Sequence, residues 1–232
     1  MTQAVIFDLD GTLIDTEPVW DAVRRELAAQ DGIEWPESAS RAMMGMSTRE
    51  WSRYMSDVVG VGPTAEIVAR RTIDRLIERY DHDLPVLPGA REVVRRLAEH
   101  WPLAVASSSP RDLIEHALQA LGVRGLIAVV RSTEEGTARG KPAPDAFLWA
   151  ASQLNADPAR TVVIEDSASG IQAGLNAGMP VIAVPRPFLT PPEDVLARAS
   201  VVLEHLDDLT VDLVRDLTPP FDPVEPPSPS AG

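Results

Sequence analysis

The stretch Ala4-Val5-Ile6-Phe7-Asp8-Leu9-Asp10-Gly11-Thr12-Leu13 decides the fold of this chain. Its first apolar residues predict a short buried β-strand that ends in two carboxylates and then a glycine. Because side chains alternate along a strand, we expect Asp8 and Asp10 on one side and Leu9 on the other. Two such acids repel each other and lose solvation, which a bound cation or a shared proton relieves. Capping of the next turn is the structural alternative.

Composition narrows the class of protein. The 232 residues are 44% hydrophobic and 24% charged, which is ordinary for a globular protein with a substantial core. The absence of cysteine excludes disulfides, thiolate metal sites and cysteine nucleophiles. A formal net charge of −14 argues against nucleic-acid or anionic-membrane partners. With neither a basic leader nor a long apolar run, we expect a cytoplasmic location. We also expect a monomer, although no residue pattern carries this expectation.

Short β-branched segments alternate with helical patterns through most of the chain. The predicted strands are residues 3–8, 103–107, 127–131, 161–165, 181–184 and 200–203. The predicted helices are residues 89–100, 110–121, 145–154 and 168–177, with Ser109 expected to cap the second. This alternation predicts an α/β fold, a doubly wound parallel sheet with a Rossmann-like core, whose ligands bind at the carboxyl ends of the strands.

Residues 17–87 interrupt this alternation and read as amphipathic helices. One apolar stripe holds Val19, Trp20, Val23 and Leu27, and another holds Trp51, Tyr54, Met55 and Val58. Ser47 and Glu50 have the spacing of a capping box, and a third helix is expected at 64–80. We therefore predict an all-helical cap domain at 17–87 and a catalytic core at 1–16 and 88–217. The tail 218–232 has six prolines and is expected to be disordered.

Further polar groups follow the later strands. Ser107 and Ser108 end one strand, Lys141 lies in a loop before a helix, and Glu165-Asp166 ends another strand. Each has a purely structural interpretation as a helix cap or a solvated charge. In a doubly wound sheet, however, they converge with Asp8 at one crevice.

Carboxylates gathered at one crevice call for a cation. Two unit charges about 4 Å apart interact by about 4 kcal/mol at an effective dielectric near 20. Because only a few oxygen ligands are offered, a partly hydrated Mg²⁺ fits better than Ca²⁺ or Zn²⁺.

These motifs resemble those of a known family. Asp8-Leu9-Asp10-Gly11-Thr12, Ser107, Lys141 and Glu165-Asp166, in this order, resemble the haloacid dehalogenase superfamily, and the helical insert resembles its small cap. The segments Asp15-Thr16-Glu17-Pro18 and Lys141-Pro142-Ala143-Pro144 are similar to the branch of β-phosphoglucomutase-like phosphatases. The resemblance covers roughly residues 1–209.

The resemblance implies a mechanism and a substrate class, a small phosphorylated metabolite and in particular a sugar phosphate. Asp8 is expected to attack the phosphate monoester and form an aspartyl phosphate. Asp10 is expected to protonate the leaving alcohol and then activate water. Ser107, with Ser108, and Lys141 are expected to bind the phosphoryl group.

The same resemblance implies a magnesium site. Its expected ligands are the Asp8 carboxylate, the backbone carbonyl of Asp10 and the Asp166 carboxylate. Glu165 is expected either as a further ligand or as a residue behind the ligands.

Asp10 argues against the dehalogenases of this superfamily, because they lack this second aspartate.

A phosphoryl-binding signalling module, similar to response-regulator receivers, is the non-enzyme alternative. Those receivers carry the phosphoacceptor on a later strand and lack the long helical insert.

A sugar phosphomutase is the nearer alternative to a phosphatase. Related mutases place a histidine and basic residues in the cap, whereas Trp20 stands at the histidine position here. Met44 and Thr48 lie near the positions of the expected basic residues, and Arg49 is one position away. A cap poor in cations favours the phosphatase, since a mutase binds two phosphates. The candidates for contact with the leaving group are Trp20, Gly45, Met46, Arg49 and Trp51.

Overall fold

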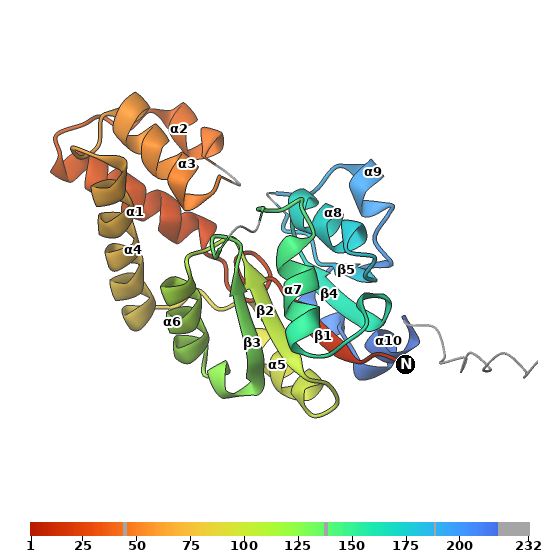
Figure 1. The fold of residues 1–232 in the computed structure, drawn as a ribbon. Helices are drawn as coiled ribbons and strands as arrows, with labels where there is room; N and C mark the ends of the chain where they lie inside the picture. Colours follow the sequence, from red (N-terminus) through yellow and green to blue (C-terminus); the bar gives the residue numbers. More distant parts are fainter. Residues whose placement is uncertain (44–45, 137–138, 188, 218–232) are drawn as a thin grey trace, which may run out of the picture.

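A computed structural model describes residues 1–43, 46–136, 139–187 and 189–217 (Figure 1). Its centre is a six-stranded sheet in the order β3-β2-β1-β4-β5-β6, and every neighbouring pair of strands is parallel. The strands are β1 Ala4–Phe7, β2 Leu103–Ser107, β3 Ile127–Ser132, β4 Thr161–Glu165, β5 Val181–Ala183 and β6 Val201–Val202. The predicted doubly wound α/β fold is thereby confirmed, and no strand end differs from its predicted position by more than one residue.

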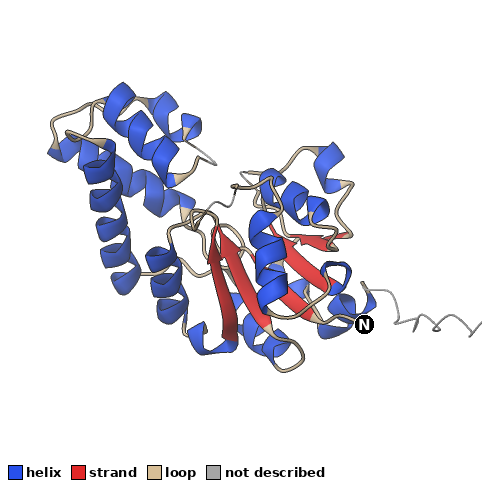
Figure 2. Cartoon of the chain, in the orientation of Figure 1, coloured by secondary structure: helices blue, strands red, loops and turns tan. Residues whose placement is uncertain are grey.

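Helices cover both faces of the sheet (Figure 2). Val5 and Phe7 pack in one apolar cluster with residues of α5 (Ala90–Ala98) and α6 (Arg111–Leu121). Ile6 points to the opposite face, where it packs in a second cluster with residues of α7 (Asp145–Gln153) and α8 (Ala168–Asn176). Because both faces are covered, all residues of β1, β2, β4 and β5 are buried, which explains their apolar sequences.

The order of the strands reverses at β1, since β2 pairs with one of its edges and β4 with the other. The register aligns Phe7 with Ile164, and the Asp8 N–H donates to the Ile164 carbonyl at 2.9 Å. Asp8 therefore follows β1 directly beside the acidic pair that ends β4. This is the switch point at which doubly wound sheets bind ligands.

The chain between β1 and α5 folds into helices that lie together beyond the carboxyl ends of the strands (Figure 1). They are α1 Glu17–Gln30, α2 Glu37–Ala42, α3 Thr48–Arg53, the π-helix η1 Tyr54–Val59 and α4 Ala65–His82. The two connections to the core run side by side, because Asp15 N–H donates to Pro85 at 2.7 Å and Leu87 N–H donates to Leu13 at 3.1 Å. We call residues 17–82 the helical insert.

Two details of the sequence prediction are wrong. Val58 was expected in the buried stripe with Trp51 and Met55, but it is 66% exposed. The π-helical turn after Arg53 has more residues per turn than an α-helix, so the buried face shifts and Val61 is buried instead. Ser109 does not cap α6, because Pro110 holds the cap position and no side chain caps this helix.

The predicted capping box of α3 is confirmed. The Glu50 carboxylate accepts hydrogen bonds from the Ser47 backbone N–H at 2.9 Å and from its hydroxyl at 2.7 Å. This cap fixes the start of a helix that lines the site described below.

Several short helices have no counterpart in the prediction. They are η2 Arg124–Leu126, η3 Pro158–Arg160, α9 Glu193–Leu196, η4 Leu206–Asp208 and α10 Val211–Asp216. Each is too short to produce a periodic apolar pattern. Across the described part of the chain, no helix has both the length and the apolar character needed to cross a membrane. The predicted tail 218–232 lies outside the described residues.

Candidate active site

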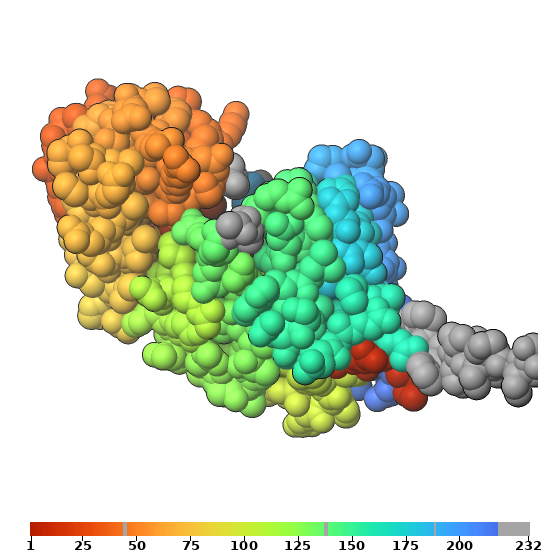
Figure 3. Space-filling view, viewed as in Figure 1, coloured from red at the N-terminus to blue at the C-terminus, as the bar shows by residue number. Residues whose placement is uncertain are grey.

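A cavity of about 740 Å³ lies where the helical insert meets the carboxyl edge of the sheet. The space-filling view shows the hollow between the insert and the core (Figure 3). Asp8, Asp10, Ser108, Lys141 and Asp166 line it from the core. Segments more than 150 positions apart in sequence thus meet in one chamber, as the predicted topology requires.

Lys141 holds two of the acids at the floor of this cavity. Its Nζ lies 2.5 Å from Oδ1 of Asp8 and 2.7 Å from Oε1 of Glu165, and all three side chains are buried. Burial lowers the pKa of Lys141, but attraction to the two carboxylates outweighs this and leaves its pKa above the usual value. The lysine therefore stays charged and fixes one oxygen of Asp8.

Glu165 is committed to this arrangement through both of its oxygens. While Oε1 accepts from Lys141, Oε2 accepts from the backbone N–H of Ser167 at 2.7 Å and from its hydroxyl at 2.9 Å. The carboxylate fits only because Gly170 has no side chain, since a Cβ there would lie 1.6 Å from Oε1.

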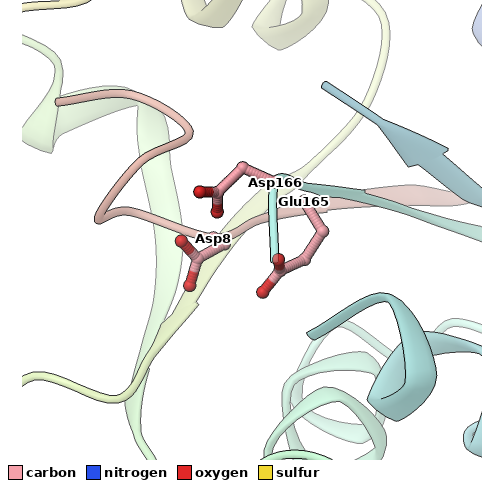
Figure 4. Close-up of side chains that lie close together, drawn as sticks. All are labelled: Asp8, Glu165 and Asp166. Atoms are coloured by element: carbon pink, nitrogen blue, oxygen red, sulfur yellow. The ribbon is translucent and has the colours of Figure 1, made fainter. Parts of the chain in front are cut away.

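Asp8, Glu165 and Asp166 form a cluster of acids where β1 and β4 end (Figure 4). Each offers an oxygen, and these oxygens lie within 4.8 Å of one another. Burial, with repulsion from Glu165, raises the pKa of Asp166 to about 8. Burial also raises the pKa of Asp8, although Lys141 opposes this shift. Positive charge from a divalent cation would favour the ionised forms of Asp8 and Asp166, and the all-oxygen donor set of the cluster suits a hard cation.

The backbone at Gly11 makes room for the cluster. Gly11 has a φ of +93°, and a Cβ at this position would lie 2.1 Å from Oδ2 of Asp166. The glycine after the two aspartates is therefore required both for its turn and for the approach of Asp166.

Asp10 lies beside the cluster and is held by three hydroxyl groups. Its Oδ1 accepts from Thr16 at 2.8 Å, and its Oδ2 accepts from Ser107 at 2.9 Å and from Ser109 at 2.8 Å. Asp8 and Asp10 both line the cavity, whereas Leu9 is buried in the core, as the alternation predicted. The contacts of Thr16 and Ser109 with Asp10 were not anticipated from the sequence.

Ser107 is the last residue of β2 and Ser108 follows it, and their side chains have different surroundings. The Ser107 side chain is fully buried, and its hydroxyl donates to Asp10 and accepts from the Ser109 N–H at 3.0 Å. Ser108 is exposed and lines the cavity. In this conformation only Ser108 presents its side chain to a ligand.

The helical insert covers the cavity with apolar side chains. Trp20, Met46 and Trp51 line it, as expected of candidates for contact with the leaving group. Arg49 does not, because it is exposed and lines a neighbouring cavity with Glu134. The fifth candidate, Gly45, lies outside the described residues.

Arg24 is a cavity residue that the sequence analysis missed. It lies on α1, is 5% exposed and lines the cavity that contains Asp8. Its guanidinium carbon lies 4.9 Å from the ring centroid of Trp20 and 5.6 Å from that of Trp51. A signal was present, because Arg24 sits between Trp20 and Leu27 at helical spacing and so interrupts an apolar stripe with a charge.

Comparison with known proteins identifies the family. Residues 2–178 match the family described as haloacid dehalogenase-like hydrolase. Hexitol phosphatase B of Escherichia coli O157:H7 is 34% identical over 215 residues, which are 89% of this chain and 94% of that protein. The chain therefore belongs to the haloacid dehalogenase-like hydrolases.

Two further likenesses cover nearly the whole chain. Validoxylamine A 7'-phosphate phosphatase of Streptomyces hygroscopicus subsp. limoneus is 32% identical, covering 90% of this chain and 96% of that protein. The crystal structure of a putative β-phosphoglucomutase from Thermotoga maritima superposes with a TM-score of 0.72 at 29% identity, covering 87% of this chain and 94% of that one.

The contact between Gly170 and Glu165 predicts the effect of one methyl group. Gly170→Ala is expected to displace the Glu165 carboxylate, release Lys141 from one of its two acids and lower kcat by about 100-fold. Steady-state hydrolysis of p-nitrophenyl phosphate measures this change. The control is Gly125→Ala, since a Cβ there meets nothing within 4 Å. Equal rates for the two variants would contradict the assignment.

The raised pKa of Asp166 predicts how stability depends on pH and metal. Its folded pKa of about 8 exceeds the usual 3.8, so the stability it contributes is present at low pH and is lost as pH rises through 8. In EDTA, we expect the melting temperature to fall between pH 6 and pH 9, by about 2–4 °C for each kcal/mol lost.

Excess Mg²⁺ should raise the melting temperature more at pH 9 than at pH 6, where protons compete for the site. Asp166→Asn removes the titrating group and serves as the reference for the general effect of net charge. Parallel melting curves for wild type and variant across this range, with and without Mg²⁺, would contradict the prediction.

Proposed function

We propose that this protein is a Mg²⁺-dependent phosphatase that hydrolyses small phosphate monoesters, in particular sugar phosphates, through an aspartyl phosphate on Asp8. The observation that carries the proposal is the position of Lys141 Nζ between Asp8 and Glu165 on the floor of a covered cavity. Support comes from the family, whose relatives above are named hexitol phosphatase B and validoxylamine A 7'-phosphate phosphatase.

Asp8 acts as the nucleophile in this proposal. Lys141 binds Oδ1, which leaves Oδ2 to attack phosphorus as the bond to the leaving alcohol breaks. Lys141 also offsets negative charge on the phosphoryl oxygens, and Ser108 lines the same cavity. Glu165 positions Lys141 through Oε1, while its Oε2 accepts hydrogen bonds from the backbone N–H and the hydroxyl of Ser167.

Asp10 acts as the general acid and base. It donates a proton to the oxygen of the leaving alcohol in the first step. In the second step it takes a proton from water, which attacks the phosphorus and releases phosphate and free Asp8. The hydroxyls of Thr16, Ser107 and Ser109 keep the Asp10 carboxylate at the cavity, so Ser107 serves this aspartate in the observed conformation.

Mg²⁺ would be held by Asp8 and Asp166, with the Asp10 carbonyl as the further ligand that the family resemblance implies. When bound, it supplies positive charge that offsets the acids and the phosphoryl group. The Lys141 side chain is buried, which strengthens its interaction with a phosphoryl group compared with the same contact in bulk water.

The nucleophile and the cation are tested with p-nitrophenyl phosphate. Asp8→Asn is expected to lower kcat by at least about 10⁴-fold, because the amide cannot form the aspartyl phosphate. EDTA is expected to abolish wild-type turnover, and Mg²⁺ to restore it. Asp212→Asn on α10, where the side chain is 82% exposed, is the control and should match wild type. Activity that survives both Asp8→Asn and EDTA would refute the mechanism.

A separate assay distinguishes a phosphatase from a phosphomutase. We expect incubation with β-glucose 1-phosphate and a trace of the 1,6-bisphosphate to release inorganic phosphate in step with substrate loss. Malachite-green and glucose 6-phosphate dehydrogenase assays follow the two products. Accumulation of glucose 6-phosphate without matching free phosphate would establish the mutase instead.

A further inference from the structure

The helical insert contributes a buried arginine to the cavity, Arg24, which the proposed mechanism does not use. Arg24 is only 5% exposed to solvent, and it lines the same cavity as Asp8. Its Nε has no hydrogen-bond partner, and its guanidinium forms no ion pair with any residue that the structure describes. A guanidinium is always charged and offers five N–H donors, so this group is costly to bury unpaired.

Glu17 and Asp21 attract this charge from a distance but form no ion pair with it in the described part of the chain. Asp21 forms an ion pair with Arg25, whose Nε lies 2.7 Å from Oδ2 of Asp21. The Oδ1 atom of Asp21 accepts a hydrogen bond from the Ser40 hydroxyl. Glu17 also lines the cavity, but burial raises its pKa and so disfavours its charged form. Neither acid lies within ion-pair distance of Arg24 in the part of the chain described.

Two tryptophans fix Arg24 without occupying its donors. Trp20 and Trp51 stand edge to face, with centroids 5.6 Å apart and planes at 75°, and both rings contact the guanidinium. Such contacts are made through the ring faces and stabilise the cation. The N–H groups therefore remain available to a ligand in the cavity.

We propose that Arg24 is a second oxyanion subsite, so that the preferred substrate is a phosphate monoester carrying a further carboxylate or phosphate on its leaving group. This inference rests on the proposed function. The scissile phosphate belongs to the core side, with Asp8 and Lys141, whereas Arg24 reaches the cavity from the helical insert. A planar guanidinium pairs with two oxygens of one carboxylate or phosphate at once.

The charge of the whole protein strengthens this assignment. A net charge of −14 repels a substrate with two anionic groups at long range. A local cation is therefore needed at each end of such a substrate, and Lys141 lines the cavity from the core while Arg24 lines it from the insert.

The test compares substrates that differ only in the distant group. The first pair is 6-phosphogluconate and sorbitol 6-phosphate, which differ by a carboxylate in place of a hydroxymethyl group. The second pair is fructose 1,6-bisphosphate and fructose 6-phosphate, which tests a second phosphate. Each is measured as a substrate, or as a competitive inhibitor of p-nitrophenyl phosphate hydrolysis when turnover is too slow.

We expect wild type to favour the anionic member of at least one pair by about 10-fold or more in kcat/KM or in Ki. The pair that shows the preference tells whether the subsite takes a carboxylate or a phosphate. Arg24→Met should reduce that ratio to near one, mainly through KM, and Arg24→Lys should retain part of it. The matched control is Arg25→Met on the neighbouring, more exposed position, which should leave the ratio unchanged.

Each remaining outcome counts against the inference. If wild type shows no preference in either pair while hydrolysing p-nitrophenyl phosphate, the subsite is refuted and the proposed function stands. If Arg24→Met lowers kcat/KM equally for anionic and neutral substrates, Arg24 supports the insert or the scissile phosphate instead. If wild type hydrolyses none of these esters with Mg²⁺, the proposed function fails and the subsite fails with it.

Discussion

Buried negative charge at the carboxyl edge of the sheet is the constraint on which the rest of this structure depends. Asp8, Glu165 and Asp166 each place a carboxylate oxygen within 4.8 Å of the others. Lys141 forms ion pairs with Asp8 and Glu165. Burial raises the pKa values of Asp8 and Asp166, so positive charge from a bound cation would favour their ionised forms. Neighbouring groups hold this arrangement in place. Glu165 accepts a hydrogen bond from Lys141, and the hydroxyl and N–H of Ser167 donate to Glu165 in turn.

The acids can approach one another because the backbone leaves space for them. Gly11 and Gly170 occupy positions where a Cβ would overlap the carboxylates of Asp166 and Glu165. Parallel pairing of β1 with β4 then brings these turns together from opposite ends of the sequence. The geometry of the site is thus a property of the sheet edge, while the insert supplies the walls that separate it from water.

The two sides of the cavity have opposite electrical character. The core presents acids, hydroxyls and one lysine, whereas the insert presents tryptophans that flank a buried arginine. The strands hold the residues that would act on the phosphate, which is the group that all phosphate monoesters have in common. The leaving group varies between substrates, and side chains on an inserted helix are free to differ without disturbing the strands that hold Asp8.

By itself, the sequence determined the strands, their arrangement in a doubly wound parallel sheet and the collection of Asp8, Lys141 and the acidic pair at one edge. These follow from local apolar patterns and from topology, which depend on neighbouring residues and on general rules of chain connection. The tertiary structure alone decided that Ser107 bonds to Asp10, since the hydroxyl and carboxylate come from segments 97 positions apart. It likewise decided that Arg24 is buried with no ion-pair partner among the residues that the structure describes, because burial of a charge depends on what packs over it, and no local pattern records that.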